Sequence, residues 1–572
     1  MQAVDEKVSH FLNKNQQFTI PIFQRKYDWQ QKQCKQLFED IIRIGQSDDE
    51  SHFLGSIVHL NDDHNIIPTY RVIDGQQRLT TLTLLISALA KYLYLNHIDE
   101  IEITPKKLLN YYLINPSEEG DLEYKIKLND SDKKTLQKII DNVLSENEVR
   151  FKEGHDSKRI IDNYHYFIKN INENNAKNIF QGFQKLSIIV ISLKERLDNP
   201  QLIFESLNSK GLPLSKSDLI RNYVLMGLNP HEQDKIYTDY WKEMEDLFEE
   251  IDYQFDRFIK DYLTIKLNKT PVDNEIYYEF KKYAQNFYRN HDDDKFVNIK
   301  NLTMDIYKYF NYFSNFYAGT EKNEYLRISF ESINELGYKI ICPFILKLYD
   351  DYTNEKLNEN DFIAILNLTE SFLFRRYICD LPSNSLNKFF AGVYERLDKS
   401  SYVGSYKLTL LAGKNNMKFP NNREFGRDFK NKDLYKKKNF AKYTLRKLEN
   451  FNFEKEPTDV KNLSIEHIMP QNEELSEEWQ KDLGREWRDI QRKYLHTIGN
   501  LTLTGYNQKL SDSSFITKRD MENGFKLSSI RLNKPLAKLN HWNESQILKR
   551  ANDFTQKAYK IWPYPKLQTK LK

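Results

Sequence analysis

The sequence predicts a multidomain protein of the α+β class, and three observations support this prediction. Short apolar runs alternate with helical patterns up to about residue 228. The pattern of residues 229–400 is helical throughout, and residues 401–572 contain two short strands followed by a polar helix. We therefore expect a mixed α and β domain over 1–228, a helical linker domain over 229–400 and a strand–strand–helix domain over 401–572.

Local signals justify the elements of the first domain. Residues 18–29 are extended and end in a polar and aromatic cluster, and an amphipathic helix through Leu37 and Ile41 follows them. Gly211 is expected to end a helix and Ser215 to cap the next one. The remaining signals predict a short strand over 53–58, a loop over 61–65, a strand that ends at Asp74 and a strand over 187–193.

Residues 70–85 are the most informative segment. An extended run ends at Asp74, Gly75 makes a turn, and an apolar stretch long enough for a buried helix follows. A helix N-terminus binds anions through its unpaired N–H groups, and Arg78 adds a bidentate donor for phosphate. Asp74 is a candidate to hold a metal ion or a sugar hydroxyl. Neutral donors at the helix start are Gln76, Gln77, Thr80 and Thr81. A capped buried helix gives the same spacing, so both interpretations stay open at this point.

A second cluster of polar residues lies near the end of the chain. Residues 463–468 and 500–504 are predicted strands, and a polar helix is expected near Tyr506. In this frame His467 is a candidate general base, with Glu466 and Asn507 as oxygen ligands for a divalent ion. Because neighbouring strand residues face opposite sides, Glu466 and His467 need a local twist to serve one site. A Glu–His pair alone is usually a surface pair.

Length, cysteine content and charge limit the class of protein. At 572 residues the chain is long enough for roughly two to four domains. Cys34, Cys342 and Cys379 are too few and too far apart for a zinc quartet or a disulfide framework, which favours a reducing compartment. The chain shows no secretion signal or membrane-spanning run, and we expect it in the cytoplasm. The net charge of +3 indicates no partner class.

Charge is uneven along the chain. Residues 232–256 are acidic with interleaved aromatics and are expected to form a solvated helix face. Arg375 and Arg376 lie within an apolar helix, where a structural ion pair is favoured over a phosphate contact. Residues 407–447 contain 13 basic and three acidic residues, a local charge of +10, with the densest cluster at 436–438. Such a segment suits a nucleic-acid backbone, although a charge run is more often simply solvated.

Several motifs together resemble one family. They are Phe23-Gln-Arg25, Tyr27, Trp29, Phe53-Leu-Gly55, the segment 74–81, Phe204-Glu-Ser-Leu-Asn-Ser-Lys-Gly211, Glu466-His-Ile-Met-Pro470, Gly499-Asn-Leu-Thr-Leu503 and Asn507. In this order they resemble GmrSD-type modification-dependent restriction endonucleases, in a single-chain fusion similar to SspE and BrxU. The resemblance implies a ParB/sulfiredoxin-like N-terminal domain that binds and hydrolyses a nucleoside triphosphate, and a C-terminal HNH (ββα-metal) nuclease domain. The chain has no Walker loop and no GxGxxG after a strand, so a nucleotide would bind without a Walker lysine.

The resemblance also implies roles for individual residues. His467 becomes the general base, Asn500 braces its loop, and His496 orients the substrate phosphate. Glu466 and Asn507 become ligands of Mg²⁺ or Mn²⁺, although many HNH sites have Asp in place of this glutamate. The nucleotide motif, for GTP or ATP, comprises Gln24, Arg25, Asp74, Gly75, Gln76, Gln77, Arg78, Thr80 and Thr81, with Asn208, Asp218, Arg221 and Asn222 as weaker candidates.

The leading hypothesis is a nucleotide-regulated endonuclease that cuts or nicks double-stranded, modified phage DNA. One alternative is a nucleotide-switched DNA-binding effector without nuclease activity. Another is a defence toxin that cleaves RNA, because a basic segment binds the phosphate backbone of either nucleic acid. The sequence leaves open which modification is recognised, which nucleotide is preferred and whether the chain forms a homo-oligomer.

Overall fold

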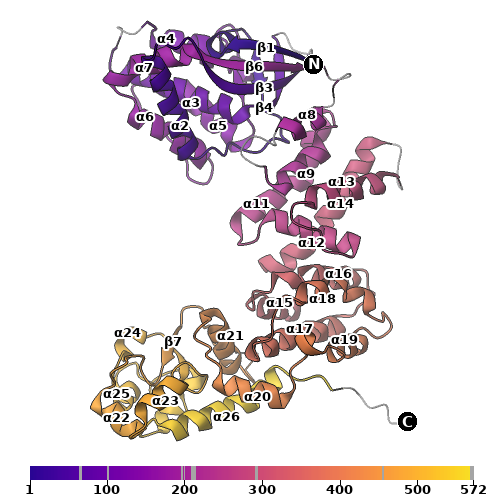
Figure 1. Ribbon diagram of the computed structural model, residues 1–572, viewed down its shortest axis with the longest axis vertical. Helices are drawn as coiled ribbons and strands as arrows, with labels where there is room; N and C mark the ends of the chain where they lie inside the picture. The colour runs from indigo at the N-terminus through magenta and orange to yellow at the C-terminus, as the bar shows by residue number, and fades with distance from the viewer. Residues whose placement is uncertain are drawn as a thin grey trace. The chain divides into compact units, whose positions relative to one another are not determined.

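The computed structural model describes residues 1–62, 67–98, 102–194, 198, 200–207, 214–289, 294–453 and 456–566. The chain forms two compact units, one of Met1–Glu250 and Tyr277–Met304, the other of Ile251–Ile276 and Asp305–Lys572. Helices and strands are both present, which confirms the predicted multidomain α+β class (Figure 1). No helix in the described part of the chain is both long and apolar enough to cross a lipid bilayer.

The first unit contains a six-stranded mixed sheet. Its strand order is β1-β6-β3-β4-β2-β5. The β1–β6 and β3–β4 pairs are antiparallel, and the β6–β3, β4–β2 and β2–β5 pairs are parallel. The strands are β1 (Gln2–Lys7), β2 (Gln17–Thr19), β3 (His52–Asp62), β4 (Thr69–Asp74), β5 (Ile126–Lys127) and β6 (Leu186–Leu193).

Helix α3 (Gln76–Leu95) is the central helix of this unit. Leu79, Leu82 and Leu89 are fully buried in a core that α2, α6 and α7 also line. Figure 1 shows α2, α3 and α6 packed side by side next to the sheet. The other helices here are α1 (Val8–Leu12), α2 (Gln31–Gln46), α4 (Pro105–Leu108), α5 (Asp130–Asp141), α6 (Lys158–Asn170), α7 (Glu173–Lys185), α8 (Pro200–Leu207), α9 (Lys216–Leu225), α10 (Pro230–Ile236) and α11 (Lys242–Glu250).

Several local predictions for this unit can be compared with the structure. Strand β3 is longer than the predicted 53–58, so Asn61 and Asp62, expected in a loop, belong to the strand because they pair with β4. The rest of that loop, and Gly211, lie outside the described residues. Ser215 caps α9 as predicted, and its Oγ accepts a hydrogen bond from the Asp218 N–H at 3.0 Å.

The second unit is helical up to a short hairpin. No strand occurs between 229 and 400 among the residues the structure describes. The predicted strands near 463–468 and 500–504 are present as the antiparallel pair β7 (Ser464–His467) and β8 (Leu501–Thr504), and α24 begins at Asn507. Helix α13 (Ile276–Arg289) belongs to the first unit except for its first residue, and α14 (Lys295–Phe313) begins in the first unit and ends in the second. The other helices of the second unit are α12 (Phe255–Leu267), α15 (Glu324–Asn334), α16 (Cys342–Thr353), α17 (Glu359–Ile378), α18 (Leu386–Gly392), α19 (Tyr402–Leu411), α20 (Asn422–Asn431), α21 (Lys438–Glu449), α22 (Glu477–Leu483), α23 (Trp487–Tyr494), α24 (Asn507–Leu510), α25 (Phe515–Asp520) and α26 (Glu544–Ile561).

The prediction that Arg375 and Arg376 form ion pairs is wrong. Both guanidinium groups are buried on α17, and their hydrogen-bond partners are carbonyl and amide oxygens. Arg375 donates to the carbonyls of Trp562 and Pro420 at 2.7 and 3.1 Å. Burial lowers the pKa of Arg375 to about 10, since no carboxylate in the described part of the chain pairs with it to compensate for the lost water. Backbone oxygens of non-helical segments need donors, and two multidentate guanidinium groups supply them.

His59 on β3 makes the stability of the first unit sensitive to acid. Its ring is buried, Ser192 Oγ lies 3.2 Å from its Nε2, and burial lowers its pKa from 6.5 to about 4. In the unfolded chain His59 is therefore protonated below pH 6.5, whereas in the folded unit it is protonated only below about pH 4. We expect the wild type to lose about 3 kcal/mol of stability over this interval that His59→Gln does not lose. Urea unfolding at pH 7 and pH 4 measures the difference. Equal losses in the two proteins would contradict this prediction.

Candidate functional site

The start of α3 has a shape that depends on two glycines. Gly75 has φ = 99°, a left-handed conformation that a glycine adopts without strain, and it ends β4 so that α3 can begin at Gln76. Gly55 has φ = 125° at an irregularity in the β3 register. A Cβ on Gly55 would lie 2.2 Å from Nη1 of Arg78. The guanidinium of Arg78 therefore occupies the space that a side chain at position 55 would fill.

Arg78 is held in place by its neighbours. Its Nη1 donates to the Ser56 carbonyl at 2.7 Å, and its Nη2 lies 3.4 Å from Oδ2 of Asp74, four residues earlier. About a fifth of each of these two side chains is exposed, so both remain accessible from solvent. The strand–turn–helix predicted from residues 70–85 is thus present, and it fixes one cation and one carboxylate at the mouth of the turn.

Gln77 organises the loop that precedes α2. Its Oε1 accepts hydrogen bonds from the N–H groups of Asp28 and Trp29 at 2.8 and 3.1 Å, and its Nε2 donates to the Lys26 carbonyl at 3.3 Å. Gln24, from the same loop, donates to the Ile73 carbonyl at 2.8 Å. These bonds attach residues 24–29 to the end of β4 and the start of α3.

The two threonines of the motif serve the helix itself. Thr80 Oγ1 donates to the Gln76 carbonyl at 2.9 Å, and Thr81 Oγ1 donates to the Gln77 carbonyl at 2.7 Å. Thr81 also lies 2.7 Å from the Tyr27 hydroxyl, in a buried contact. Their hydroxyl groups are therefore engaged by main-chain oxygens rather than directed at an open site.

An open cleft of about 210 Å³ lies at this turn. Seven of the thirteen predicted nucleotide-site residues line it, together with two aromatic residues from the motifs, Trp29 and Phe204. Arg25 and Arg78 bring positive charge to the cleft, and Arg25 Nη1 lies 3.6 Å from Asp28 Oδ2. The seven residues are Gln24, Arg25, Asp74, Gly75, Gln76, Gln77 and Arg78.

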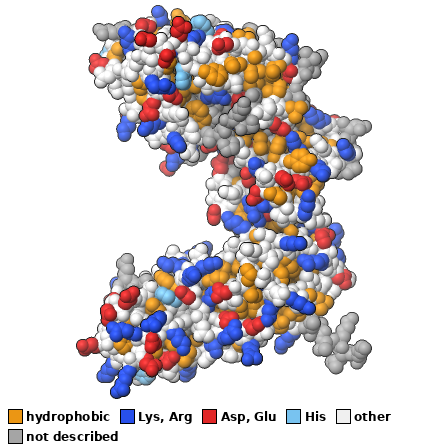
Figure 2. Space-filling view, in the orientation of Figure 1, with side chains coloured by type: hydrophobic (Ala, Val, Ile, Leu, Met, Phe, Trp, Pro, Cys, Tyr) orange, Lys and Arg blue, Asp and Glu red, His pale blue; other side chains and the backbone are white. Residues whose placement is uncertain are grey.

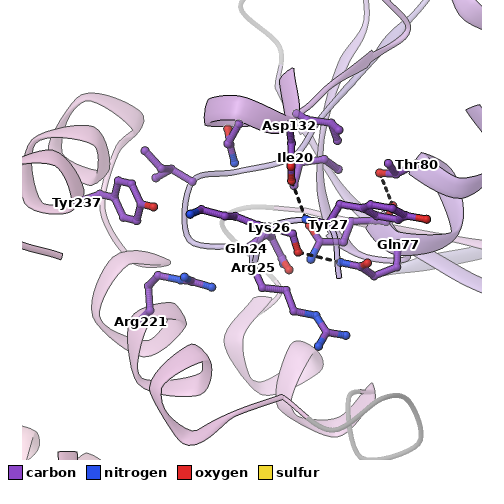
Figure 3. Close-up of a pocket in the computed structure, with 14 residues that line it drawn as sticks. Ile20, Gln24, Arg25, Lys26, Tyr27, Gln77, Thr80, Asp132, Arg221 and Tyr237 are labelled. Carbon is purple, nitrogen blue, oxygen red and sulfur yellow. Dashed lines mark hydrogen bonds between the residues drawn. The ribbon is translucent and has the colours of Figure 1, made fainter. Parts of the chain in front are cut away.

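A much smaller cavity adjoins the same loop, and Figure 3 shows the side chains around it. Its volume of about 20 Å³ is enough for about one water molecule. Asp132 accepts the Tyr27 N–H at 2.6 Å (Figure 3). Arg221 donates to the Phe23 carbonyl at 3.0 Å. Arg221 also donates to Asp218 at 2.9 Å and to Glu245, an acidic residue that was expected on a solvated face. This cavity belongs to the packing of the loop.

The weaker nucleotide-site candidates do not reach the larger cleft. Asp218 lines neither cavity, since it caps α9 and pairs with Arg221. Asn222 is buried, and its Oδ1 has no hydrogen-bond partner among the residues that the structure describes. Asn208 lies outside the described residues.

His467 and His496 meet at the end of strand β7. Nε2 of His467 lies 3.0 Å from Nδ1 of His496, so one ring donates a hydrogen bond to the other. The Tyr435 ring packs against both, with centroids 4.5 Å from His467 and 5.4 Å from His496. Burial, reinforced by His496 and Lys518, lowers the pKa of His467 to about 3. The His467 ring is therefore neutral at neutral pH.

Glu466 faces a different partner from its neighbour His467. Its Oε1 accepts a hydrogen bond from the Lys518 ammonium at 2.6 Å, and the same ammonium donates to the His467 carbonyl at 2.9 Å. Both side chains are almost completely buried. Burial raises the pKa of Glu466 and lowers that of Lys518, while each charge opposes the shift of the other. The ion pair ties α25 to strand β7.

Asn500 connects the loops on either side of the hairpin. It is fully buried, donates to the carbonyls of Met469 and Leu495 at 3.0 Å each, and accepts from the Met469 N–H at 2.8 Å. The main chain of Asn507 begins α24, but its side chain lies outside what the structure describes. Within the described residues, no group of three His, Cys, Asp or Glu side chains is placed to hold a metal ion.

Three residues near the candidate sites were not singled out from the sequence. Tyr435 lies in the basic segment, which drew attention only for its charge. Lys518 follows Glu466 by 52 positions, and nothing in the local pattern indicates their contact. Ser56 contributes only its carbonyl, whose position depends on the neighbouring Gly55.

Family models match both parts of the chain that carry these sites. The N-terminal domain of GmrSD restriction endonuclease matches residues 8–225, which include the Arg78 cleft. The C-terminal domain of GmrSD restriction endonucleases matches residues 419–557, which include His467 and His496. A comparison with curated proteins finds no match. Since the two domains occur in order and together cover most of the chain, this protein belongs to the GmrSD family of restriction endonucleases.

Proposed function

We propose that this restriction endonuclease hydrolyses phosphodiester bonds in foreign, modified DNA through an HNH-type site, and that GTP or ATP bound at the Arg78 cleft controls the cutting. The observation that carries the proposal is the buried contact between His467 and His496 within the segment that matches the GmrSD C-terminal domain. A defence enzyme that cuts DNA has to spare the DNA of its own cell, and nucleotide control supplies one means of doing so.

In this proposal His467 accepts a proton from the attacking water. The ring is neutral at neutral pH, since the pKa is about 3, so it has one acceptor nitrogen. The proposal requires that Nε2 donates its proton to His496, which makes Nδ1 the nitrogen that accepts the proton from water. Contacts with His496 and Tyr435 fix the direction of the ring. A phosphodiester anion next to the ring stabilises the imidazolium form, so substrate binding raises the basicity of His467 as the reaction begins.

The HNH reading also implies Mg²⁺ or Mn²⁺, which when bound supplies charge stabilisation for the departing oxygen. The described residues do not fit a metal held by Glu466 beside His467. The Glu466 carboxylate is bound by Lys518, and adjacent strand residues face opposite sides. Glu466 here anchors strand β7 through Lys518, and this anchoring orients His467.

The Arg78 cleft supports the nucleotide part of the proposal through its charge and its rings. Arg25 and Arg78 supply planar guanidinium donors that suit phosphate oxygens, and Trp29 offers an aromatic face to a base. The Asp74 carboxylate, partly exposed at the same turn, is a suitable acceptor for sugar hydroxyl groups.

Replacing His467 tests the nuclease assignment. We expect His467→Ala to slow cleavage of phage DNA by about 10²- to 10⁴-fold, because the water loses its proton acceptor. Cutting is measured on modified and unmodified phage DNA in gel assays with Mg²⁺ or Mn²⁺. His541→Ala, an exposed histidine in the same unit, is the matched control and should cut as the wild type does. Unchanged cutting by His467→Ala would discard the assignment.

The Glu466–Lys518 pair gives a test that separates anchoring from metal binding. We expect Lys518→Met to lose about 3–5 kcal/mol of stability, because it leaves a buried carboxylate unpaired. The double variant Glu466→Gln/Lys518→Met should recover most of this loss in urea unfolding. Calorimetric titration with Mn²⁺ should give the same affinity for Glu466→Gln and the wild type. A loss of Mn²⁺ binding in Glu466→Gln, with unchanged stability, would make Glu466 a metal ligand instead.

The nucleotide site is tested through Arg78 and the glycine that makes room for it. We expect Arg78→Ala to weaken binding of a fluorescent GTP or ATP analogue by about 10- to 100-fold, the value of one or two charged hydrogen bonds. Gly55→Ala should also weaken binding, because its Cβ displaces the guanidinium. Arg43→Ala, on the exposed side of α2, is the control. If Arg78→Ala binds the nucleotide analogue as tightly as the wild type does, the assignment of the nucleotide to this cleft is wrong.

A further inference from the structure

An open cleft of about 510 Å³ lies in the second unit. One wall is the turn after α15, residues 335–338, and the other is the start of α21, residues 437–440. Ser383 also contributes to the lining. The lining brings together two lysines, Lys437 and Lys438, and two aromatic residues, Tyr338 and Phe440.

The charge of this cleft is positive and largely uncompensated. Lys436, Lys437 and Lys438 are exposed, and no described carboxylate forms an ion pair with any of them. The acidic residue of the lining, Glu335, is bound by Arg446 through two hydrogen bonds of 3.0 and 2.8 Å. Figure 2 shows Lys and Arg side chains gathered over the region where Figure 1 labels α21. A polyanion therefore complements this surface.

The cleft is joined to the histidine pair by a short stretch of chain. The ammonium of Lys438 lies 5.1 Å from the centroid of the Tyr435 ring. The same ring packs against His467 and His496, and the N–H of Leu434 donates to the His496 carbonyl at 3.1 Å. Residues 434–440 thus run from the histidine pair to the cleft, so that one polymer chain can occupy both.

Aromatic rings pack together beneath the cleft and lie close to the Lys437 ammonium. Phe440 stacks on Tyr377 with centroids 3.7 Å apart, and Tyr338 meets the edge of Phe440 at 6.4 Å. The Lys437 ammonium lies 5.4 Å from the Tyr377 centroid and 5.7 Å from that of Phe440. Cations beside aromatic rings are the pattern that nucleic-acid strands bind, through phosphates and sugar or base faces.

We propose that this cleft binds the sugar-phosphate backbone of the DNA strand that His467 cuts, with Lys437 and Lys438 as the phosphate contacts. The inference rests on the proposed function, because it places the substrate of the same site. Phosphate contacts position a strand without reading its sequence, so the cleft fixes the register of the scissile bond rather than the choice of target.

The experiment measures DNA binding separately from cutting. Full-length protein with His467→Ala is titrated into fluorescently labelled duplex DNA, and anisotropy is followed at several salt concentrations. Adding Lys437→Glu and Lys438→Glu should weaken binding at least tenfold. It should also make the slope of log K against log salt shallower by roughly 1.8, or about 0.9 for each lost phosphate contact. The control is Lys322→Glu with Lys356→Glu, two exposed lysines of the same unit that lie outside the cleft.

The outcomes separate this inference from the proposed function. If Lys437→Glu/Lys438→Glu leaves the affinity for DNA and its salt dependence unchanged, the cleft does not bind DNA, even if His467→Ala abolishes cutting. Equal losses in the control pair also overturn it, because they reduce the effect to net charge. If the lysine variants bind DNA more weakly but the His467→Ala enzyme still cuts at the wild-type rate, the cleft is supported and His467 is rejected as the general base. If labelled RNA shows the lysine dependence and DNA does not, the assignment to DNA fails. Lys437→Gln/Lys438→Gln, which removes charge without reversing it, should give about half the loss in free energy of the Glu variants if phosphate contacts are the cause.

Discussion

The geometry of the candidate nuclease site depends on one buried ammonium. Lys518 donates both to the carboxylate of Glu466 and to the main-chain carbonyl of His467, and it is wholly shielded from water. Strand β7 is only four residues long and pairs with one other strand, which alone gives weak positional control. The ion pair fixes the strand on one side, and the His496 and Tyr435 contacts fix it on the other. The direction of the His467 ring follows from both.

The N-terminal motif shows a similar division between folding and binding. Gln77, Thr80 and Thr81 use their polar groups to attach the 24–29 loop and to satisfy α3. Arg25, Asp74 and Arg78 keep part of their polar surface exposed at the cleft. A polar motif at a helix start is therefore not a uniform ligand site. Of the two interpretations left open by the spacing, the capped helix holds for Gln77, Thr80 and Thr81, and the anion site stays a prediction for the residues that line the cleft.

Local signals in the sequence predicted what local geometry decides. The strand, glycine turn and buried helix over 70–85, the Ser215 cap, both strands of the hairpin and the helix at Asn507 are all present. Contacts between residues far apart in the sequence could not be predicted, because the spacing of residues along the chain does not indicate which of them meet in the fold. Lys518 meets Glu466 only after the chain has folded, and Arg78 needs the bulge at Gly55. The ion-pair prediction for Arg375 failed for the same reason, since its carbonyl partners are far away in the sequence.

Those carbonyl partners tie helix α17 to chain segments that precede and follow the hairpin in the sequence. Arg375 binds the carbonyls of Pro420 and Trp562, which lie at the start and just past the end of the segment that matches the C-terminal domain. Arg376 adds the carbonyls of Asn416 and Lys418. Helix α17 therefore holds both edges of the domain through one pair of guanidinium groups. Catalytic side chains need support that is fixed to within a fraction of an ångström, and loops alone do not provide it. Burying two arginines that have no carboxylate partner among the described residues is costly, yet it satisfies several backbone oxygens at once.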